Sequence, residues 1–213
     1  MTDTVRPNPA EHSIRLFRNA FLEALTHVHP IVPLLFWGQI ALILIARAVV
    51  VHGVPVLALL PLALAGVLVW SLSEYLLHRF VFHFPATSRV GQWLVFLFHG
   101  VHHDAPRDKT RLVMPPAGAI IVMFFLWQIF GLVVPAPWLQ PFVGFFILGY
   151  LGYDYIHYAT HHFPMRHPVL HFLKVYHLQH HYGAKGVRFG VSSPLWDHVF
   201  GTYPAPAPAR GAE

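Results

Sequence analysis

The sequence predicts an all-α integral membrane protein, with four transmembrane helices paired as two hairpins and a cytosolic helical cap. Three observations lead to this prediction. Hydrophobic residues make up 55% of the 213 residues and charged residues only 11%, whereas a soluble domain carries about 25% charged residues. Four apolar stretches are each long enough to cross a bilayer. The histidines that form repeated motifs, and almost all basic residues, lie beyond the ends of these stretches.

The first predicted hairpin begins at Ile31. Its first span runs from Ile31 to Val51 and contains one charge, Arg47, which lies near the far end and can reach the head groups. A tight turn at Gly53-Val54-Pro55 leads into the second span, from Val54 to about Leu77. Both spans meet the requirement of about 20 helical residues for a hydrocarbon core.

The second predicted hairpin follows a polar and basic stretch, residues 84–111, in which Val90 to Leu97 forms a short amphipathic piece. The third span runs from about Leu112 to Val134 and is interrupted at Pro115-Pro116. After a second tight turn, the fourth span runs from about Leu139 to Tyr158. Residues 31–203 therefore form one membrane domain.

The two ends of the chain are predicted to lie outside this domain. Asn8 to Glu11 has the residue types of a helix start. From Ile14 to Val28, apolar residues recur at helical spacing, which predicts an interfacial amphipathic helix within residues 1–30. A short soluble helix packed on the domain is the alternative. Residues 204–213 are rich in Pro and Ala, and we expect a disordered tail.

The distribution of basic residues predicts the topology. Thirteen of the fourteen Lys and Arg residues lie outside the spans, and the turns near residues 53 and 136 contain none. The positive-inside rule therefore places both termini and residues 84–111 in the cytoplasm. Because the basic residues adjoin apolar spans, the formal charge of +5 does not indicate nucleic-acid binding.

Ten of the eighteen histidines form a repeated pattern. Each half of the chain has a pair of histidines followed by an H-x-x-H-H triplet, at residues 99–103 and 177–181. Residues three or four apart share one face of a helix, and several imidazoles on one face are suited to hold metal. The candidate metal ligands are His78, His83, His99, His102, His103, His157, His161, His177, His180 and His181. All ten are predicted on the cytoplasmic side.

The first pair places a condition on the backbone. His78 and His83 are five residues apart, about 140° around an α-helix, so the helix must end or bend between them if both bind the same ion. Carboxylates precede two ligands: Glu74 lies four residues before His78, and Asp154 lies three before His157. Each can accept a ring N–H and fix the tautomer.

Three further residues are candidates for the site or its support: His162, His171 and Asp197. His162 follows a ligand but points about 100° away on a helix. His171 is six residues before His177 and could face the same cluster. A solvent or surface position is the alternative for each.

The composition of the candidate site limits its chemistry. The chain has no cysteine, so the ligands are nitrogen and oxygen. Ten imidazoles exceed the capacity of one ion and suit two, each with about five ligands and room for another molecule. A dimetal iron centre at a membrane surface can activate O₂ and oxidise an unreactive C–H bond. No phosphate loop or nicotinamide fingerprint competes with this assignment.

Four motifs resemble the fatty acid hydroxylase/sterol desaturase superfamily of membrane diiron enzymes: E-Y-L-L-H-R-F-V-F-H at 74–83, H-G-V-H-H at 99–103, D-Y-I-H-Y-A-T-H-H at 154–162 and H-L-Q-H-H at 177–181. A fifth stretch, F-G-V-S-S-P-L-W-D at 189–197, is similar to the fatty acid 2-hydroxylase branch. The resemblance covers about residues 30 to 203.

The resemblance implies that the ten histidines bind two iron ions in a cap above four spans, and that the enzyme hydroxylates a lipid acyl chain next to its carbonyl with O₂ and two external electrons. Zinc can occupy such a site in purified protein. Because only about 30 residues precede the first span, we expect a separate electron-donor protein, cytochrome b5-like or ferredoxin-like. The alternatives are the same fold acting on a sterol, carotenoid or alkyl lipid or as a desaturase, and a membrane metal-binding or transport protein.

Overall fold

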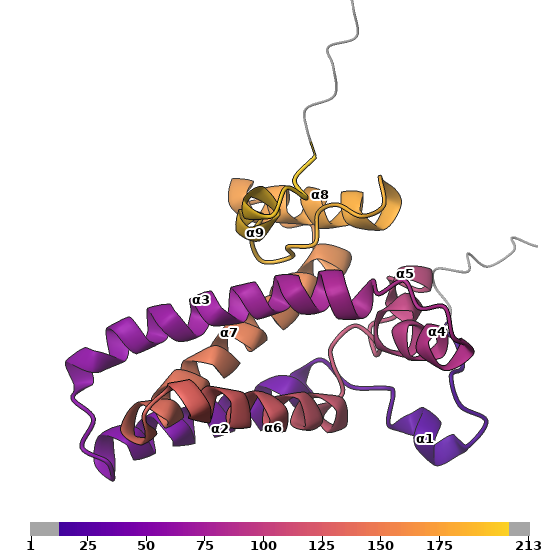
Figure 1. The fold of residues 1–213 in the computed structure, drawn as a ribbon. Coiled ribbons are helices and arrows are strands. Elements are labelled where there is room, and N and C mark those ends of the chain that lie inside the picture. The colour runs from indigo at the N-terminus through magenta and orange to yellow at the C-terminus, as the bar shows by residue number, and fades with distance from the viewer. Residues whose placement is uncertain (1–12, 205–213) are drawn as a thin grey trace, which may run out of the picture.

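The computed structural model describes residues 13–204, and every regular element within them is a helix. Four long helices form the body: α2 (Ile31–Val50), α3 (Leu59–Leu77), α6 (Pro116–Val133) and α7 (Ala136–His162). Smaller helices gather around the ends of α3 and α7 (Figure 1). They are α1 (Ala20–Ala24), the π-helical turns η3 (His78–Phe82) and η4 (Phe96–Gly100), α4 (Arg89–Val95), α5 (Val101–Asp104), α8 (Pro168–Tyr182) and α9 (Leu195–Val199).

The two helical hairpins are present with the predicted turns. Gly53 adopts φ 64° between α2 and the short 3₁₀ turn η2 (Val56–Ala58), a conformation that glycine reaches without steric cost. Pro115 and Pro135 stand immediately before α6 and α7, where the fixed φ of a proline favours a helix start. The third helix therefore begins after Pro115 rather than at Leu112, and the fourth starts three residues earlier than predicted and extends to His162.

Helix α7 is the central helix of the body, packed between α2 and α3 (Figure 1). Close approach depends on glycine. A Cβ on Gly144 of α7 would lie 2.7 Å from Ile45 Cγ1 and 3.0 Å from the Ala41 carbonyl oxygen of α2. A Cβ on Gly66 of α3 would lie 2.8 Å from Phe145 Cβ of α7. Small residues at such contacts let backbones pack tightly, as in membrane helix bundles.

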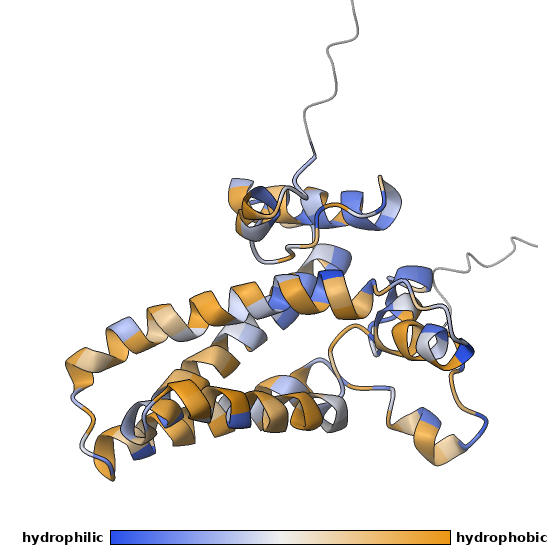
Figure 2. Ribbon diagram, viewed as in Figure 1, coloured by the Kyte–Doolittle hydropathy of each residue, from blue (hydrophilic) through white to orange (hydrophobic). Residues whose placement is uncertain are grey.

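The outer faces of the body are apolar. Leu42 of α2, Leu60 of α3 and Phe124 of α6 are all exposed, and Figure 2 shows hydrophobic residues along these helices and hydrophilic ones on α5 and α8. Such a large exposed apolar surface is typical of a membrane or protein interaction surface. Two segments, Ile31–Val50 and Val56–Phe82, are long and apolar enough to cross a membrane, and the apolar segment Gly118–Val133 is shorter.

The N-terminal helix is much shorter than predicted. Of the expected helix from Ile14 to Val28, only Ala20–Ala24 is helical. The Asn19 side chain caps α1 by accepting from the Phe21 and Leu22 amides, while the Glu23 carboxylate accepts from the amides of Leu16 and Phe17. These side-chain acceptors hold the preceding residues in a non-helical turn. The expected helix start at Asn8 to Glu11 and the expected disordered tail, apart from Pro204, lie outside the described residues.

The packing at α7 gives a test with two substitutions of the same kind in one helix. We expect Gly144→Ala to lower stability by about 1–3 kcal/mol, because the added methyl group overlaps α2. Gly152→Ala is the control: nothing lies within 4 Å of the place that its added methyl group would take, and alanine favours a helix over glycine by roughly 0.5–1 kcal/mol. Thermal unfolding in detergent measures both. Equal effects on Tm would contradict the close packing of α2 on α7.

Candidate metal centre

The structure brings the ten predicted ligands together in two groups of five. In each group, one ligand nitrogen from every histidine lies within 4.8 Å of the others. The first group is His78, His83, His99, His103 and His180, and the second is His102, His157, His161, His177 and His181. Each group mixes histidines from both halves of the chain, so neither half builds a site alone.

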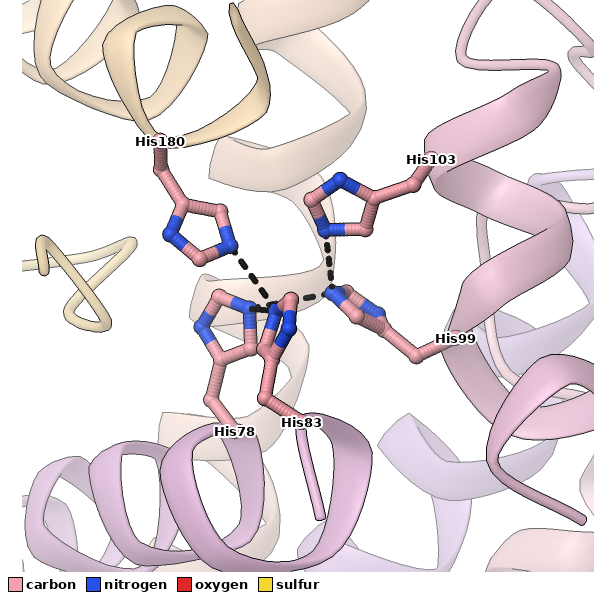
Figure 3. A group of neighbouring side chains, drawn as sticks. All are labelled: His78, His83, His99, His103 and His180. Atoms are coloured by element: carbon pink, nitrogen blue, oxygen red, sulfur yellow. Dashed lines mark hydrogen bonds between the residues drawn. The ribbon is translucent and has the colours of Figure 1, made fainter. Parts of the chain in front are cut away.

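The first group converges from three directions (Figure 3). His78 and His83 come from the end of α3, His99 and His103 from η4 and α5, and His180 from α8. The Nε2 atoms of His99 and His103 are 3.0 Å apart, and that of His180 lies 3.0 Å from that of His83. All five rings point toward one another.

A π-helical turn allows His78 and His83 to share this group. The His83 amide donates to the His78 carbonyl at 3.1 Å, a spacing of five residues that brings both side chains onto one face. Their Nε2 atoms are 3.2 Å apart. The bend that the sequence required between these residues is therefore present, as a widened turn. A second such turn, η4, precedes His102 and His103.

The second group also brings five imidazole nitrogens close together. His157 and His161 come from the last turns of α7, His177 and His181 from α8, and His102 from α5. The Nε2 atom of His102 lies 2.9 Å from that of His157 and 3.0 Å from that of His181. The two groups adjoin, since the rings of His103 and His181 stack with their centroids 4.1 Å apart.

The tautomers of two ligands fit a bound cation. His78 Nδ1 donates to the Phe189 carbonyl, and His180 Nδ1 donates to the Val187 carbonyl at 3.0 Å. A neutral imidazole with its proton on Nδ1 presents a lone pair at Nε2. These Nε2 lone pairs therefore face other nitrogens about 3 Å away, an arrangement that a metal ion stabilises.

Burial keeps the rings neutral, as metal ligation requires. Burial, with His180 as a neighbour, lowers the pKa of His83 to about 4. Burial together with His180, His83 and His161 lowers the pKa of His103 to about 3. The pKa of His177 is also well below the ordinary value because the ring is buried among other histidines. The unprotonated ligands are thus available at neutral pH.

Glu74 is placed differently from the prediction. Its carboxylate accepts from the Val191 amide at 2.6 Å and from the Ser192 amide and hydroxyl, not from a ring N–H of His78. Asp197, which is fully buried, accepts from the amides of Phe189 and Gly190. The two carboxylates therefore fix the 189–192 loop, and the loop carbonyl of Phe189 orients His78.

The other candidates lie at the edge of the site or outside it. Asp154 is buried and accepts from the Tyr150 hydroxyl at 3.3 Å, rather than from His157. His162 is next to His161 but belongs to neither group of five. His171 is exposed on α8. The sequence patterns gave no sign of the carbonyl acceptors at Val187 and Phe189, because any residue supplies a carbonyl.

A cavity adjoins the histidines. Its volume, about 420 Å³, is within the usual size range of ligand pockets. His99, His102 and His157 border it, so it reaches both groups of five. Its other walls are mostly apolar, from α3, α6 and α7, with contributions from the segment before α2. A long apolar molecule bound in this cavity would lie against histidines of both groups of five.

Comparisons with known proteins agree with these features. The family model described as fatty acid hydroxylase matches residues 63–202. The chain is 38% identical to the dihydroceramide fatty acyl 2-hydroxylase FAH1 of Arabidopsis thaliana over 200 residues, covering 93% of this chain and 84% of that protein. It is 33% identical to the human fatty acid 2-hydroxylase, covering 91% of this chain and 58% of that protein.

The ceramide very long chain fatty acid hydroxylase SCS7 of Saccharomyces cerevisiae is 42% identical, over 66% of this chain and 37% of the yeast protein. The chain therefore spans well under two thirds of some of these relatives. A solved structure described as full-length scs7p, with only the hydroxylase domain visible, superposes with a TM-score of 0.83 at 38% identity. That match covers 89% of this chain and 71% of the other.

Two histidines on different helices, His180 of α8 and His162 of α7, give a test of the metal groups. We expect His180→Ala to remove about half of the bound metal, because it opens one group of five and leaves the other intact. His162→Ala is the control, since His162 lies beside the second group but outside both. Elemental analysis of the purified variants measures the metal per chain. Equal metal loss in both variants would contradict the assignment of ligands.

Proposed function

The chain belongs to the fatty acid hydroxylase family, and from this membership and the site we propose that it hydroxylates the acyl chain of a membrane lipid at the carbon next to the carbonyl. The observation that carries the proposal is the apolar cavity bordered by His99, His102 and His157. An acyl chain in this cavity would present its C–H bonds to both histidine groups. The names of the relatives favour a lipid-linked or free fatty acyl chain and the 2-position.

We assign two iron ions to the two groups of five histidines. When bound, they would supply the activation of O₂, in which one oxygen atom enters a C–H bond and the other leaves as water with two electrons and two protons from outside. Zinc could occupy the same ligands in purified protein.

The protein's own residues have three tasks in this proposal. The loop carbonyls of Phe189 and Val187 hold the tautomers of His78 and His180. The apolar walls, including Val122 and Leu126 of α6, exclude water and align the acyl chain. The buried imidazoles stay unprotonated, so protons do not compete with metal ions for their nitrogens at neutral pH.

We further propose that α2, α3, α6 and α7 each cross the bilayer, with the histidine groups and both chain ends on the cytoplasmic side. The distribution of Lys and Arg supports this orientation. With this orientation, the histidines near the ends of α3 and α7 would face the cytoplasm, together with those of η4, α5 and α8 that gather around them. Electrons would then come from a separate cytoplasmic donor, cytochrome b5-like or ferredoxin-like.

Growth in ¹⁸O₂ tests the proposed reaction. We expect total lipids from cells that express the chain with a reductant system to contain a new hydroxylated acyl species carrying one ¹⁸O, at the carbon next to the carbonyl. Mass spectrometry with fragmentation locates the label. Cells expressing His180→Ala should lack this species, and cells expressing His162→Ala should retain it.

Two other results would contradict the proposal. A new double bond without label would identify a desaturase. Unchanged lipids in the presence of bound metal and reductant would favour a membrane metal-binding or transport protein.

A further inference from the structure

Arg111 borders the apolar cavity and lies next to a segment that we call the N-terminal strap, residues 13–28. Arg111 lines the cavity, and so do Leu16, Phe17, Leu22, Leu25 and Thr26 of the strap. Hairpin topology places the starts of α2 and α6 and the ends of α3 and α7 at one end of the body (Figure 1). The strap precedes α2 and Arg111 precedes α6, so both lie at the histidine end.

Most of the Arg111 side chain is engaged by the strap. Its Nη2 atom donates to Glu23 and, at 2.8 Å, to His27 Nε2. Its Nε atom donates to Ser13 Oγ at 3.1 Å and lies 3.5 Å from Asp108 Oδ2. The strap is also fixed through the backbone, since the Val28 amide donates to the Thr110 carbonyl at 2.8 Å.

One nitrogen of Arg111 is left over. The side chain is only 3% exposed, yet Nη1 has no hydrogen-bond partner among residues 13–204. A buried guanidinium N–H without an acceptor is costly, and guanidinium keeps its protons at any relevant pH. Asp108 Oδ2, on the carboxylate beside Arg111 Nε, is also buried without a partner, so the two carboxylates do not satisfy Nη1 in this arrangement. Because Arg111 lines the cavity, a molecule bound there can supply the acceptor.

The charges around Arg111 indicate what kind of acceptor fits. Glu23 and Asp108 both lie against its guanidinium. Burial alone would raise the pKa of Glu23, but the amides of Phe17 and Leu16 and the Arg111 charge lower it to about 2. The amide and hydroxyl of Thr110 hold the pKa of Asp108 below its ordinary value as well, against the effect of burial. The guanidinium of Arg111 therefore already lies against two carboxylates that are ionised at neutral pH. His27 Nε2 accepts from Arg111, and His27 Nδ1 contacts Thr110 Oγ1 at 2.7 Å.

We propose that Arg111 is a positioning residue for the lipid: Nη1 donates to a neutral oxygen at the polar end of the substrate, such as the carbonyl of an amide-linked acyl group. The acyl tail then extends past the histidines toward Trp37 and Leu126, which line the cavity in the body. The two carboxylates disfavour a free fatty carboxylate at this position. The proposal rests on the function proposed above and adds a residue that selects the polar end of the substrate.

Binding of two probes with the same tail tests this role. Hexadecanamide and hexadecanoate differ in the charge of their polar ends, and calorimetric titration of the detergent-solubilised full chain at neutral pH measures both. Arg111→Lys keeps a positive charge beside Glu23 but removes the spare donor. We expect roughly tenfold weaker binding of hexadecanamide, corresponding to the loss of one hydrogen bond from a charged donor. Arg166→Lys, on the exposed segment after α7, is the matched control and should change neither affinity.

Glu23→Gln distinguishes recognition from a merely structural role. Glutamine still offers an oxygen to the amides of Leu16 and Phe17, but one negative charge is removed. We expect the affinity for hexadecanoate, relative to that for hexadecanamide, to rise by at least about threefold. If Arg111 and Glu23 had only a structural role, their substitution would weaken the binding of both probes equally.

The results separate this inference from the proposed function. Equal losses for both probes in Arg111→Lys and Glu23→Gln, in a wild-type chain that hydroxylates its lipid, would overturn the role of Arg111 alone. If the variants show the expected binding pattern but the wild-type chain forms no hydroxylated lipid, the role of Arg111 in recognition would stand and the proposed reaction would be overturned.

Discussion

The convergence of neutral imidazole nitrogens is the interaction on which the rest of the structure depends. Ten rings from four regions of the chain lie in two adjoining groups, with nitrogens about 3 Å apart. Where Nδ1 is committed to a carbonyl, as in His78 and His180, Nε2 offers only a lone pair. A cation bound among these nitrogens would satisfy the Nε2 lone pairs of His78 and His180. The helices and loops around the site hold the rings close enough to share such an ion.

The fold provides rigid positions for these rings. Helix α7 packs closely on its neighbours through residues such as Gly144 and Gly66, which fixes the helix ends that carry ligands from both halves. The buried carboxylates Glu74 and Asp197 fix the 189–192 loop, and that loop orients His78. The same helices enclose the apolar cavity below the histidines. The cavity and the two histidine groups therefore depend on one set of contacts.

Sequence patterns predicted the two hairpins and the gathering of the ten histidines, because apolar length and imidazole spacing are strong local signals. The π-helical turn at His78 was predictable only as a required bend. The partners of Glu74 were not predictable, since backbone amides over a hundred residues away leave no local pattern. The helix from Ile14 to Val28 was overpredicted, because periodicity does not register the competing side-chain acceptors Asn19 and Glu23. The apolar cavity was not predictable either, because residues far apart in the sequence line it.

Anomalous X-ray diffraction from crystals of the iron-loaded full chain, collected at the iron absorption edge, tests whether each group of five histidines holds one ion. We expect two anomalous peaks per chain, one within each group, and both surrounded by imidazole nitrogens. A single peak shared by both groups, or peaks bound to other residues, would contradict this expectation.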